Sequence, residues 1–291
     1  MTAAGFVPHH LSATASDLAG NGGRGRYLLL PGSPGRARAL GERFDGHQVR
    51  PHPRGHDFHL GTLSSPHGPI DVAAVSTGMG APSLEIIATE LFLLGGRRFL
   101  RVGTSGSLQP DRVHASDFVV ATAAVRDEGA SRTYAPAEFP AVASPATVLA
   151  GVRAARALGL RHHAGVVHSK DAFYAREFGH GPLAAEHAAY RAMLTGMGTL
   201  ASEMEASMLF TLRGHFEHQV RRAGALKGAL KNQVENGLEP VLAGAVFLII
   251  GEDHEYTDRA TELAQATERL IDLGLETVRQ LAALERSTTE A

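Results

Sequence analysis

The sequence contains no cysteine, which excludes disulfide bonds, a thiolate nucleophile and thiolate metal sites. Long apolar runs are missing too, since none reaches the roughly 18 residues that suggest a membrane-spanning helix. The N-terminal stretch also lacks the basic and apolar regions of a signal peptide. We therefore expect a cytoplasmic protein with no membrane partner.

A strong excess of charge of either sign is absent as well. The chain of 291 residues has 28 Lys and Arg against 30 Asp and Glu, a formal net charge of -2. This charge gives no general attraction to nucleic acid, and we expect no nucleic-acid partner. Hydrophobic residues at 44% and charged residues at 20% are typical of an ordinary globular protein. A basic residue with a role in binding must therefore act at one particular site and not through the overall charge of the protein.

Apolar runs alternate with helical patterns along most of the chain. The predicted strands, several too continuously apolar to have a wet face, are residues 26–30, 70–76, 97–103, 117–125, 163–169 and 241–250. Between them, two helical patterns end at Gly95 and Gly159, which suit helix C-caps. Strands buried on both faces and separated by helices predict an α/β fold, a three-layer α/β/α sandwich around a mixed, largely parallel central sheet.

Two further helical patterns follow in the last third of the chain. The final one starts at Thr257 or Asp258, either a suitable N-cap, and is a packing helix whose apolar face comprises Leu263, Ala266, Leu270, Leu273 and Leu281. Residues 213–236 predict an extra amphipathic helix, an insertion that packs on its own domain or forms an oligomer contact; its apolar side comprises Phe216, Val220, Leu226, Leu230 and Val234. Without an internal repeat or a clear linker, we expect residues 1–291 to form a single domain.

Three glycine-rich stretches follow predicted strands, where open α/β sheets usually bind ligands: "PGSPGR", "STGMGAPS" and "RVGTSGSLQP". Each alone is more often a structural turn, and none matches the P-loop or the dinucleotide fingerprint.

Two arginines favour a binding site. Arg36 falls in the first turn of its helix, where a cation opposes the helix dipole unless it faces an anion. Arg101 lies within an apolar strand and needs a buried partner or an anionic ligand. Together they suit phosphate, whose oxygens guanidinium binds bidentately.

Two carboxylates in "ASEMEAS" form a second candidate group. Glu203 and Glu205 share one face if the stretch is extended, or favour the dipole if it begins a helix. Beside a phosphate site, a carboxylate suits sugar hydroxyls because it accepts two hydrogen bonds at once.

A group of histidines at positions 47, 52, 56 and 59 has neither a helical pair nor a closed ligand spacing, so we expect no metal site there.

Taken together, these stretches resemble the nucleoside phosphorylase family, and specifically its uridine phosphorylase branch. "PGSPGR" is similar to the family's phosphate loop, and "VSTGMGAPSLEIIATELFLLGGRRFLRVGTSGSLQP" reads through nearly unbroken. "AVRDEGASRTYAPAEFPAVA" and "SEMEAS" follow in the family's order and spacing, so the resemblance covers most of residues 7–260.

The resemblance implies a role for individual residues. The phosphate-binding residues it implies are Gly32, Arg36, Arg101, Thr104 and His56. The ribose-binding residues are Thr104, Met204, Glu205 and, from a neighbouring subunit, His10. The base-binding residues are Ser105, Gly106, Phe173, Glu203 and Asp253, and the catalytic ones are Arg101, Glu205 and Asp253. The family uses inorganic phosphate as co-substrate without a metal or organic cofactor, and it commonly forms hexamers built from dimers, so we expect a homo-oligomer with shared active sites.

The sequence departs from the uridine branch at three points. Phe173 is followed by Arg176 but by no glutamine, although the branch reads the uracil edge with a glutamine and an arginine. Asp253 and His254 are similar to the purine phosphorylases, where an aspartate protonates the leaving purine at N7; the alternative is an acidic loop that caps the last helix. The neighbouring subunit's phosphate arginine is replaced by His56, with Arg54 as the alternative.

The function expected from this resemblance is phosphorolysis of a nucleoside, uridine or a related one, to free base and ribose 1-phosphate. The alternatives are a purine nucleoside or methylthioadenosine phosphorylase, a nucleosidase on the same fold, or a non-catalytic nucleoside-binding homologue. Paired Arg36 and Arg101 count against a nucleosidase, because a hydrolase gains nothing from a dianion site.

Overall fold

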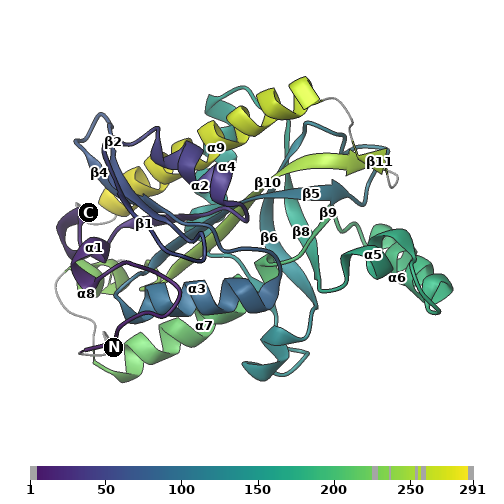
Figure 1. Cartoon of the computed structure of the whole chain (residues 1–291), viewed down its shortest axis with the longest axis horizontal. Helices are drawn as coiled ribbons and strands as arrows, with labels where there is room; N and C mark the ends of the chain where they lie inside the picture. The colour runs from purple at the N-terminus through teal and green to yellow at the C-terminus, as the bar shows by residue number, and fades with distance from the viewer. Residues whose placement is uncertain (1–4, 225–228, 236, 253–254, 257–259, 288–291) are drawn as a thin grey trace.

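The computed structural model describes residues 5–224, 229–235, 237–252, 255–256 and 260–287 (Figure 1). Its strands are β1 (Tyr27–Leu30), β2 (Asp45–Arg50), β3 (Phe58–Leu63), β4 (Ile70–Ala74), β5 (Arg98–Ser107), β6 (Phe118–Asp127), β7 (Ala141–Val142), β8 (His162–Lys170), β9 (Ala201–Glu203), β10 (Leu242–Glu252) and β11 (Glu255–Tyr256). Its helices are α1 (Ala15–Leu18), α2 (Pro34–Gly41), α3 (Ala81–Leu93), α4 (Pro145–Ala157), α5 (Phe173–Phe178), α6 (Ala184–Gly196), α7 (Ala206–Arg222), α8 (Ala229–Glu235) and α9 (Ala260–Ser287).

One mixed sheet connects all the described strands. Its order is β11-β10-β6-β8-β9-β5-β1-β4-β3-β2, with β7 paired to β6. Because β10 also pairs with β5, the strands β5, β10, β6, β8 and β9 close into a ring, and β1, β4, β3 and β2 extend from it as an open sheet. The long pairings of β10 with β5 and of β6 with β8 are parallel.

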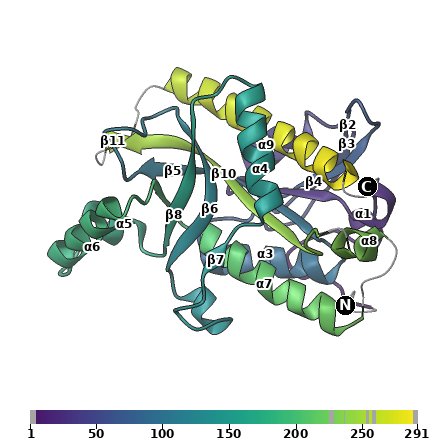
Figure 2. The ribbon, with the colours of Figure 1, turned by 180° about the vertical axis from the view of Figure 1, so that it is seen from behind.

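Helices cover both faces of the sheet. Helices α3 and α7 lie on one face, and α2, α4 and α9 lie on the other, as Figures 1 and 2 show from opposite sides. Each layer buries its own apolar cluster, with Leu91 and Phe210 in one and Leu40 and Leu270 in the other. The predicted α/β/α sandwich is therefore confirmed. Helices α5 and α6 project away from it, beyond the ends of β8 and β9 (Figure 1).

Local sequence signals fix the ends of the two central helices. Gly95 and Gly159 follow α3 and α4 with positive φ angles of 114° and 63°, so the predicted C-caps are confirmed. In each case the N–H groups of the glycine and of the residue after it donate to carbonyls in the last turn of the helix, which would otherwise lack partners.

The last helix packs as predicted and anchors two central strands. Ala266, Leu270, Leu273 and Leu281 are buried on the inner face of α9, while its predicted N-caps lie outside the described residues. Near its end the fully buried Glu285 accepts hydrogen bonds from Arg98 at 2.6 Å and from the hydroxyl of Tyr27. Burial and the carboxylate of Glu285 raise the pKa of Tyr27. The end of the chain is thereby joined to the beginnings of β1 and β5.

The prediction of one helix over residues 213–236 is wrong in its bounds. Residues 213–222 are instead the second half of α7, which begins at Ala206 and continues through the apolar stretch "MLFTL". The short helix α8 follows as a separate element. Phe216 and Val220 are buried, and the ring of Phe216 stacks on that of Phe92 with centroids 4.0 Å apart. This part of the chain belongs to the layer that covers the sheet.

Phe216→Ala should therefore reduce the free energy of unfolding by about 3–5 kcal/mol, the usual cost of deleting a buried aromatic ring. Urea denaturation measures the loss. Phe139→Ala is the matched control, because Phe139 is 45% exposed and its removal leaves no comparable cavity. Similar losses in the two variants would contradict the assignment of residue 216 to the core.

Candidate active site

A cleft of about 680 Å³ opens where several strands end on the same side of the sheet. The loops after β1 and β4, the carboxyl-terminal half of β5, the end of β8, the start of α5 and the junction of β9 with α7 all contribute to its lining. The three glycine-rich stretches singled out in the sequence all reach it, with Gly32, Gly78 and Gly106 among the lining residues. This is the place where open α/β sheets usually bind ligands.

The end of the cleft near β1 and β5 is cationic. Arg36 and Arg101 both line it, and a Cβ built on Gly32 would lie 3.5 Å from Nη2 of Arg101, which places the first loop beside this guanidinium. Ser33 caps α2 by accepting a hydrogen bond from the N–H of Arg36 at 3.3 Å, with Pro34 at the first helical position. The strand therefore stops at "PGSPGR" so that the next helix can begin beside Arg101.

The two arginines differ in their partners. Arg101 pairs with Glu205 at 2.5 Å, whereas within the described residues Arg36 only donates to the carbonyl of Val102 at 3.3 Å and has no carboxylate partner. Burial and the charge of Arg101 lower the pKa of Arg36 to about 10, which still leaves it charged at neutral pH. The buried Nε atoms of both arginines lack hydrogen-bond partners within the described residues. A half-buried cation without a carboxylate partner favours an anion in this part of the cleft.

Glu205 connects the cationic end with the middle of the cleft. One oxygen accepts from Arg101, and the other accepts from the backbone N–H of Gly80 at 2.7 Å. Thr77, which follows β4, accepts from the second amino group of Arg101 at 3.2 Å. Each carboxylate oxygen has a further lone pair, so Glu205 can also accept from hydroxyl groups in the cleft.

Glu203 is more deeply held than Glu205. It is the last residue of β9, and it accepts hydrogen bonds from Ser169 and from the backbone N–H groups of Glu205 and Ala206, the latter two at 2.8 and 3.0 Å. Burial and the charge of Glu205 raise its pKa, against the opposing effect of Arg101 3.8 Å away. Glu203 therefore shapes the junction that positions Glu205.

The opposite end of the cleft is lined by apolar and uncharged groups together with one lysine. Phe173 and Tyr174 lie there at the start of α5, with Ser105 and Gly106 on β5 and Ile250 on β10. The buried hydroxyl of Ser105 has no hydrogen-bond partner within the described residues. A flat apolar ligand with polar edges suits this end.

Most predicted site residues come together, and a few do not. The cleft is lined by Gly32, Arg36, Arg101, Thr104, Ser105, Gly106, Phe173, Glu203, Met204 and Glu205. His56 lies near the loop after β4, with its Nδ1 2.8 Å from the carbonyl oxygen of Ser76. His10 lies at α3, where its Nδ1 is 2.8 Å from Glu90. Asp253 and His254 lie outside the described residues.

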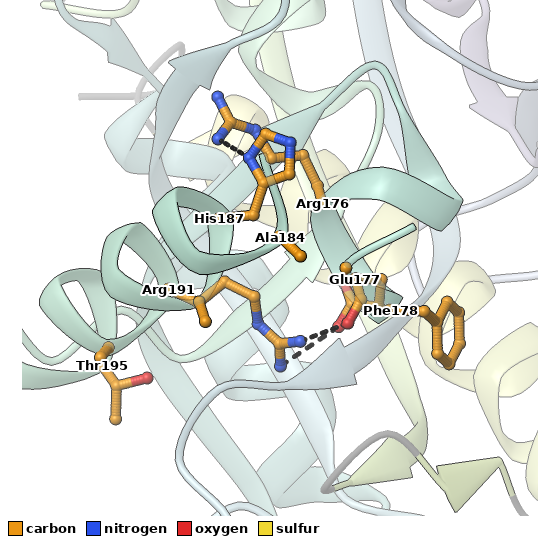
Figure 3. Close-up of a pocket in the computed structure, with 10 residues that line it drawn as sticks. Arg176, Glu177, Phe178, Ala184, His187, Arg191 and Thr195 are labelled. Atoms are coloured by element: carbon orange, nitrogen blue, oxygen red, sulfur yellow. Dashed lines mark hydrogen bonds and ion pairs between the residues drawn. The ribbon is translucent and has the colours of Figure 1, made fainter. Parts of the chain in front are cut away.

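Arg176 does not line the cleft. It lies on α5, in a separate pocket of about 350 Å³, and bonds to Nδ1 of His187 at 2.7 Å (Figure 3). It also donates to Asp127 at 2.7 Å. An arginine that reads a base edge in the cleft would have to leave both partners.

Sequence reasoning missed Lys170, which lines the same end of the cleft as Phe173 from the end of β8. A lysine at the end of an apolar strand and three residues before Phe173 was the available signal.

Of the four histidines considered for metal binding, His47 and His59 bond to each other at 3.0 Å. The described residues contain no group of three or more side chains placed to hold a metal ion. Nor does any helix among them have the length and apolarity needed to cross a membrane.

Comparison with known proteins identifies the family. A family model described as the phosphorylase superfamily matches residues 26–230. The chain belongs to this superfamily. It is 37% identical to a uridine phosphorylase of Treponema pallidum over 257 residues, which cover 84% of this chain and 95% of that protein. It is 34% identical to the uridine phosphorylase of Escherichia coli, covering 78% and 86%, and 33% identical to a guanosine phosphorylase of Halorubrum lacusprofundi, covering 69% and 75%. The resemblance to nucleoside phosphorylases is confirmed.

Within this phosphorylase-superfamily site, Arg101→Met should reduce the free energy of unfolding by about 3–5 kcal/mol, because it leaves two buried carboxylates without their cation. Arg43→Met is the control, since Arg43 pairs with Glu268 and Asp272 at the surface and an exposed ion pair contributes at most about 1 kcal/mol. Urea denaturation of both variants gives the comparison. A loss no larger for Arg101 than for Arg43 would show that Arg101 is not needed to neutralise these carboxylates.

Proposed function

We propose that the protein is a nucleoside phosphorylase, a pentosyltransferase that uses inorganic phosphate as its second substrate. The observation that carries this proposal is the pairing of Arg101, bound to Glu205, with Arg36, which has no carboxylate partner among the described residues, at one end of a single cleft. Carboxylates occupy the middle of that cleft and an aromatic ring its other end. This order matches phosphate, sugar and base in one ternary complex. The names of the relatives support the same reaction.

The phosphate would lie between Arg36 and Arg101, with the loop of Gly32 and the hydroxyl of Thr104 beside it. An oxygen of hydrogen phosphate forms the new bond at the anomeric carbon as the glycosidic bond breaks, and the electron pair of that bond passes to the base. The proton of hydrogen phosphate ends on the departing base, so that atoms and charge balance. Fixed cations hold the nucleophile in place without reorganisation at the moment of reaction.

The ribose would lie against Met204 and Glu205. The carboxylate of Glu205 is already fixed by Arg101 and by the N–H of Gly80, so its remaining lone pairs face a sugar hydroxyl in a defined direction. Negative charge there also favours a cation-like sugar in the transition state. Phe173 stacks on the base, and Ser105 and Gly106 contact its edge.

We further propose that the functional form is a homo-oligomer with shared active sites, in which His10 and His56 approach the ribose and the phosphate of a neighbouring subunit. Glu90 supports such a role for His10, because it bonds to the ring and to the backbone N–H groups of His9 and His10 and so fixes the segment. Size-exclusion chromatography with light scattering tests the assembly, and a monomer would contradict it.

Release of free base from uridine, thymidine, inosine, adenosine and methylthioadenosine, each with and without phosphate, tests the reaction itself. Release that depends on phosphate and yields ribose 1-phosphate, or the corresponding pentose 1-phosphate, is the expected result. Release without phosphate would show a nucleosidase instead, and no release from any of the five would favour a binding protein.

Arg36→Ala should raise the KM for phosphate by roughly 10- to 150-fold, since hydrogen bonds to charged groups contribute about 1.5–3 kcal/mol each. The KM for the nucleoside should change little. Arg38→Ala is the matched control, because Arg38 lies on the same helix but is exposed. Steady-state kinetics at varied phosphate measures both, and an unchanged phosphate KM in Arg36→Ala would contradict the assignment.

A further inference from the structure

Lys170 places a buried positive charge at the base end of the cleft. Its side chain is 2% exposed, yet the residue lines the cleft together with Phe173. Its Nζ lies 2.9 Å from the carboxylate of Glu177, 2.7 Å from the hydroxyl of Ser202 and 5.6 Å from the centre of the Phe173 ring. The charge therefore lies beside the surface on which a base would stack.

A network behind Lys170 holds it in place. Glu177 also pairs with Arg191 at 3.5 Å, and the backbone carbonyl of Glu177 accepts from the same guanidinium at 2.6 Å (Figure 3). The hydroxyl of Ser202 is 3.0 Å from Nδ1 of His168. Burial would raise the pKa of Glu177, but Lys170 and Arg191 outweigh that effect and lower it. Lys170 thus faces a fixed anion behind it and the cleft in front of it.

The hydrogen-bonding capacity of Lys170 is not exhausted by these contacts. An ammonium group has three N–H donors and no acceptor. Glu177 and Ser202 take two of them, which leaves one for a third group. Because a buried donor is costly without an acceptor, an oxygen brought in by a ligand would complete the site.

No other cation within the described residues competes for this end of the cleft. Arg176 is bound to Asp127 and His187, Arg191 is bound to Glu177, and neither lines the cleft. Arg36 and Arg101 lie at the phosphate end. Lys170 and the hydroxyl of Ser105 are therefore the groups available here to form hydrogen bonds with the edge of the base.

We propose that Lys170 determines base specificity by donating a hydrogen bond to a carbonyl oxygen on the edge of the base stacked on Phe173. The protein then selects nucleosides of oxo-bases over those whose base has an amino group at that position. This inference rests on the proposed function and names the substrate class of the same site.

The same contact assists departure of the base. When the glycosidic bond breaks, the base carries the electron pair and its carbonyl oxygens share the negative charge. A hydrogen bond from an ammonium strengthens as that charge develops, so it stabilises the transition state more than the bound nucleoside. An amino group offers only donors to Lys170, which would leave the lysine without its third partner.

Two pairs of nucleosides isolate this contact. Uridine has an oxo group at position 4 of the base where cytidine has an amino group, and inosine and adenosine differ likewise at position 6. In each pair the adjacent ring nitrogen carries a proton only in the oxo member. In the unaltered protein, kcat/KM for base release should favour the oxo member of at least one pair by roughly 100-fold or more, because a site built to hydrogen-bond one group rejects the analogue without it. Equal kcat/KM within both pairs, or a preference for the amino members, would overturn the inference without any variant.

Lys170→Met keeps the length of the side chain and removes its donors. It should reduce the oxo-to-amino ratio by at least tenfold while the KM for phosphate stays within about twofold, a split that a general loss of structure would not produce. Lys231→Met is the control, because Lys231 is an exposed lysine on α8. A ratio unchanged in Lys170→Met would overturn the inference.

Calorimetric binding of uridine, cytidine, inosine and adenosine separates this inference from the proposed function. If no nucleoside is turned over, the phosphorylase proposal fails, but preferential binding of oxo-nucleosides that Lys170→Met abolishes would still support the role of Lys170. Turnover that depends on phosphate but ignores the oxo and amino groups would support the phosphorylase proposal and contradict this inference.

Discussion

The ion pair between Arg101 and Glu205 is the interaction on which the rest of the site depends. It joins the middle of β5 to the turn between β9 and α7, and the second oxygen of Glu205 extends the connection to Gly80 at the start of α3. A buried guanidinium and a buried carboxylate are each costly alone, so each fixes the other. The cleft between these three segments therefore has a fixed shape before a ligand enters.

The charges along the cleft differ in how completely the protein neutralises them. Arg101 and Lys170 each have a carboxylate partner, whereas within the described residues Arg36 has none. The free energy that Arg36 costs the folded protein is recovered only when an anion binds, which gives an anionic ligand an advantage over water at that position. The folded protein is thus less stable without a ligand than it would be with a neutral side chain at this position, and ligand binding offsets that loss, as is common at functional sites.

The sequence predicted what depends on neighbours along the chain. Continuous apolar runs identified β1, β5 and β10, and Gly95 and Gly159 marked helix ends, because strand burial and helix capping leave local patterns. The boundary of α7 was not predicted correctly, since "MLFTL" is apolar except for Thr211 and therefore does not reveal helical spacing before Phe216. Lys170 was overlooked because its role depends on Ser202, thirty-two positions away in the sequence. The ring of strands was not predicted because it depends on pairings between segments still farther apart, such as β5 and β10.

The closed ring of strands has a consequence for synthesis of the protein on the ribosome. Strand β10 lies between β5 and β6, which precede it by more than a hundred residues, and Glu285 then bonds to Arg98 at the beginning of β5. Until residues 242–252 have emerged, β5 and β6 each present an unpaired, apolar edge, and such edges invite pairing with other chains. The active-site strand therefore cannot complete its pairing during most of translation, and a nascent chain must be kept from aggregating until its last segments arrive.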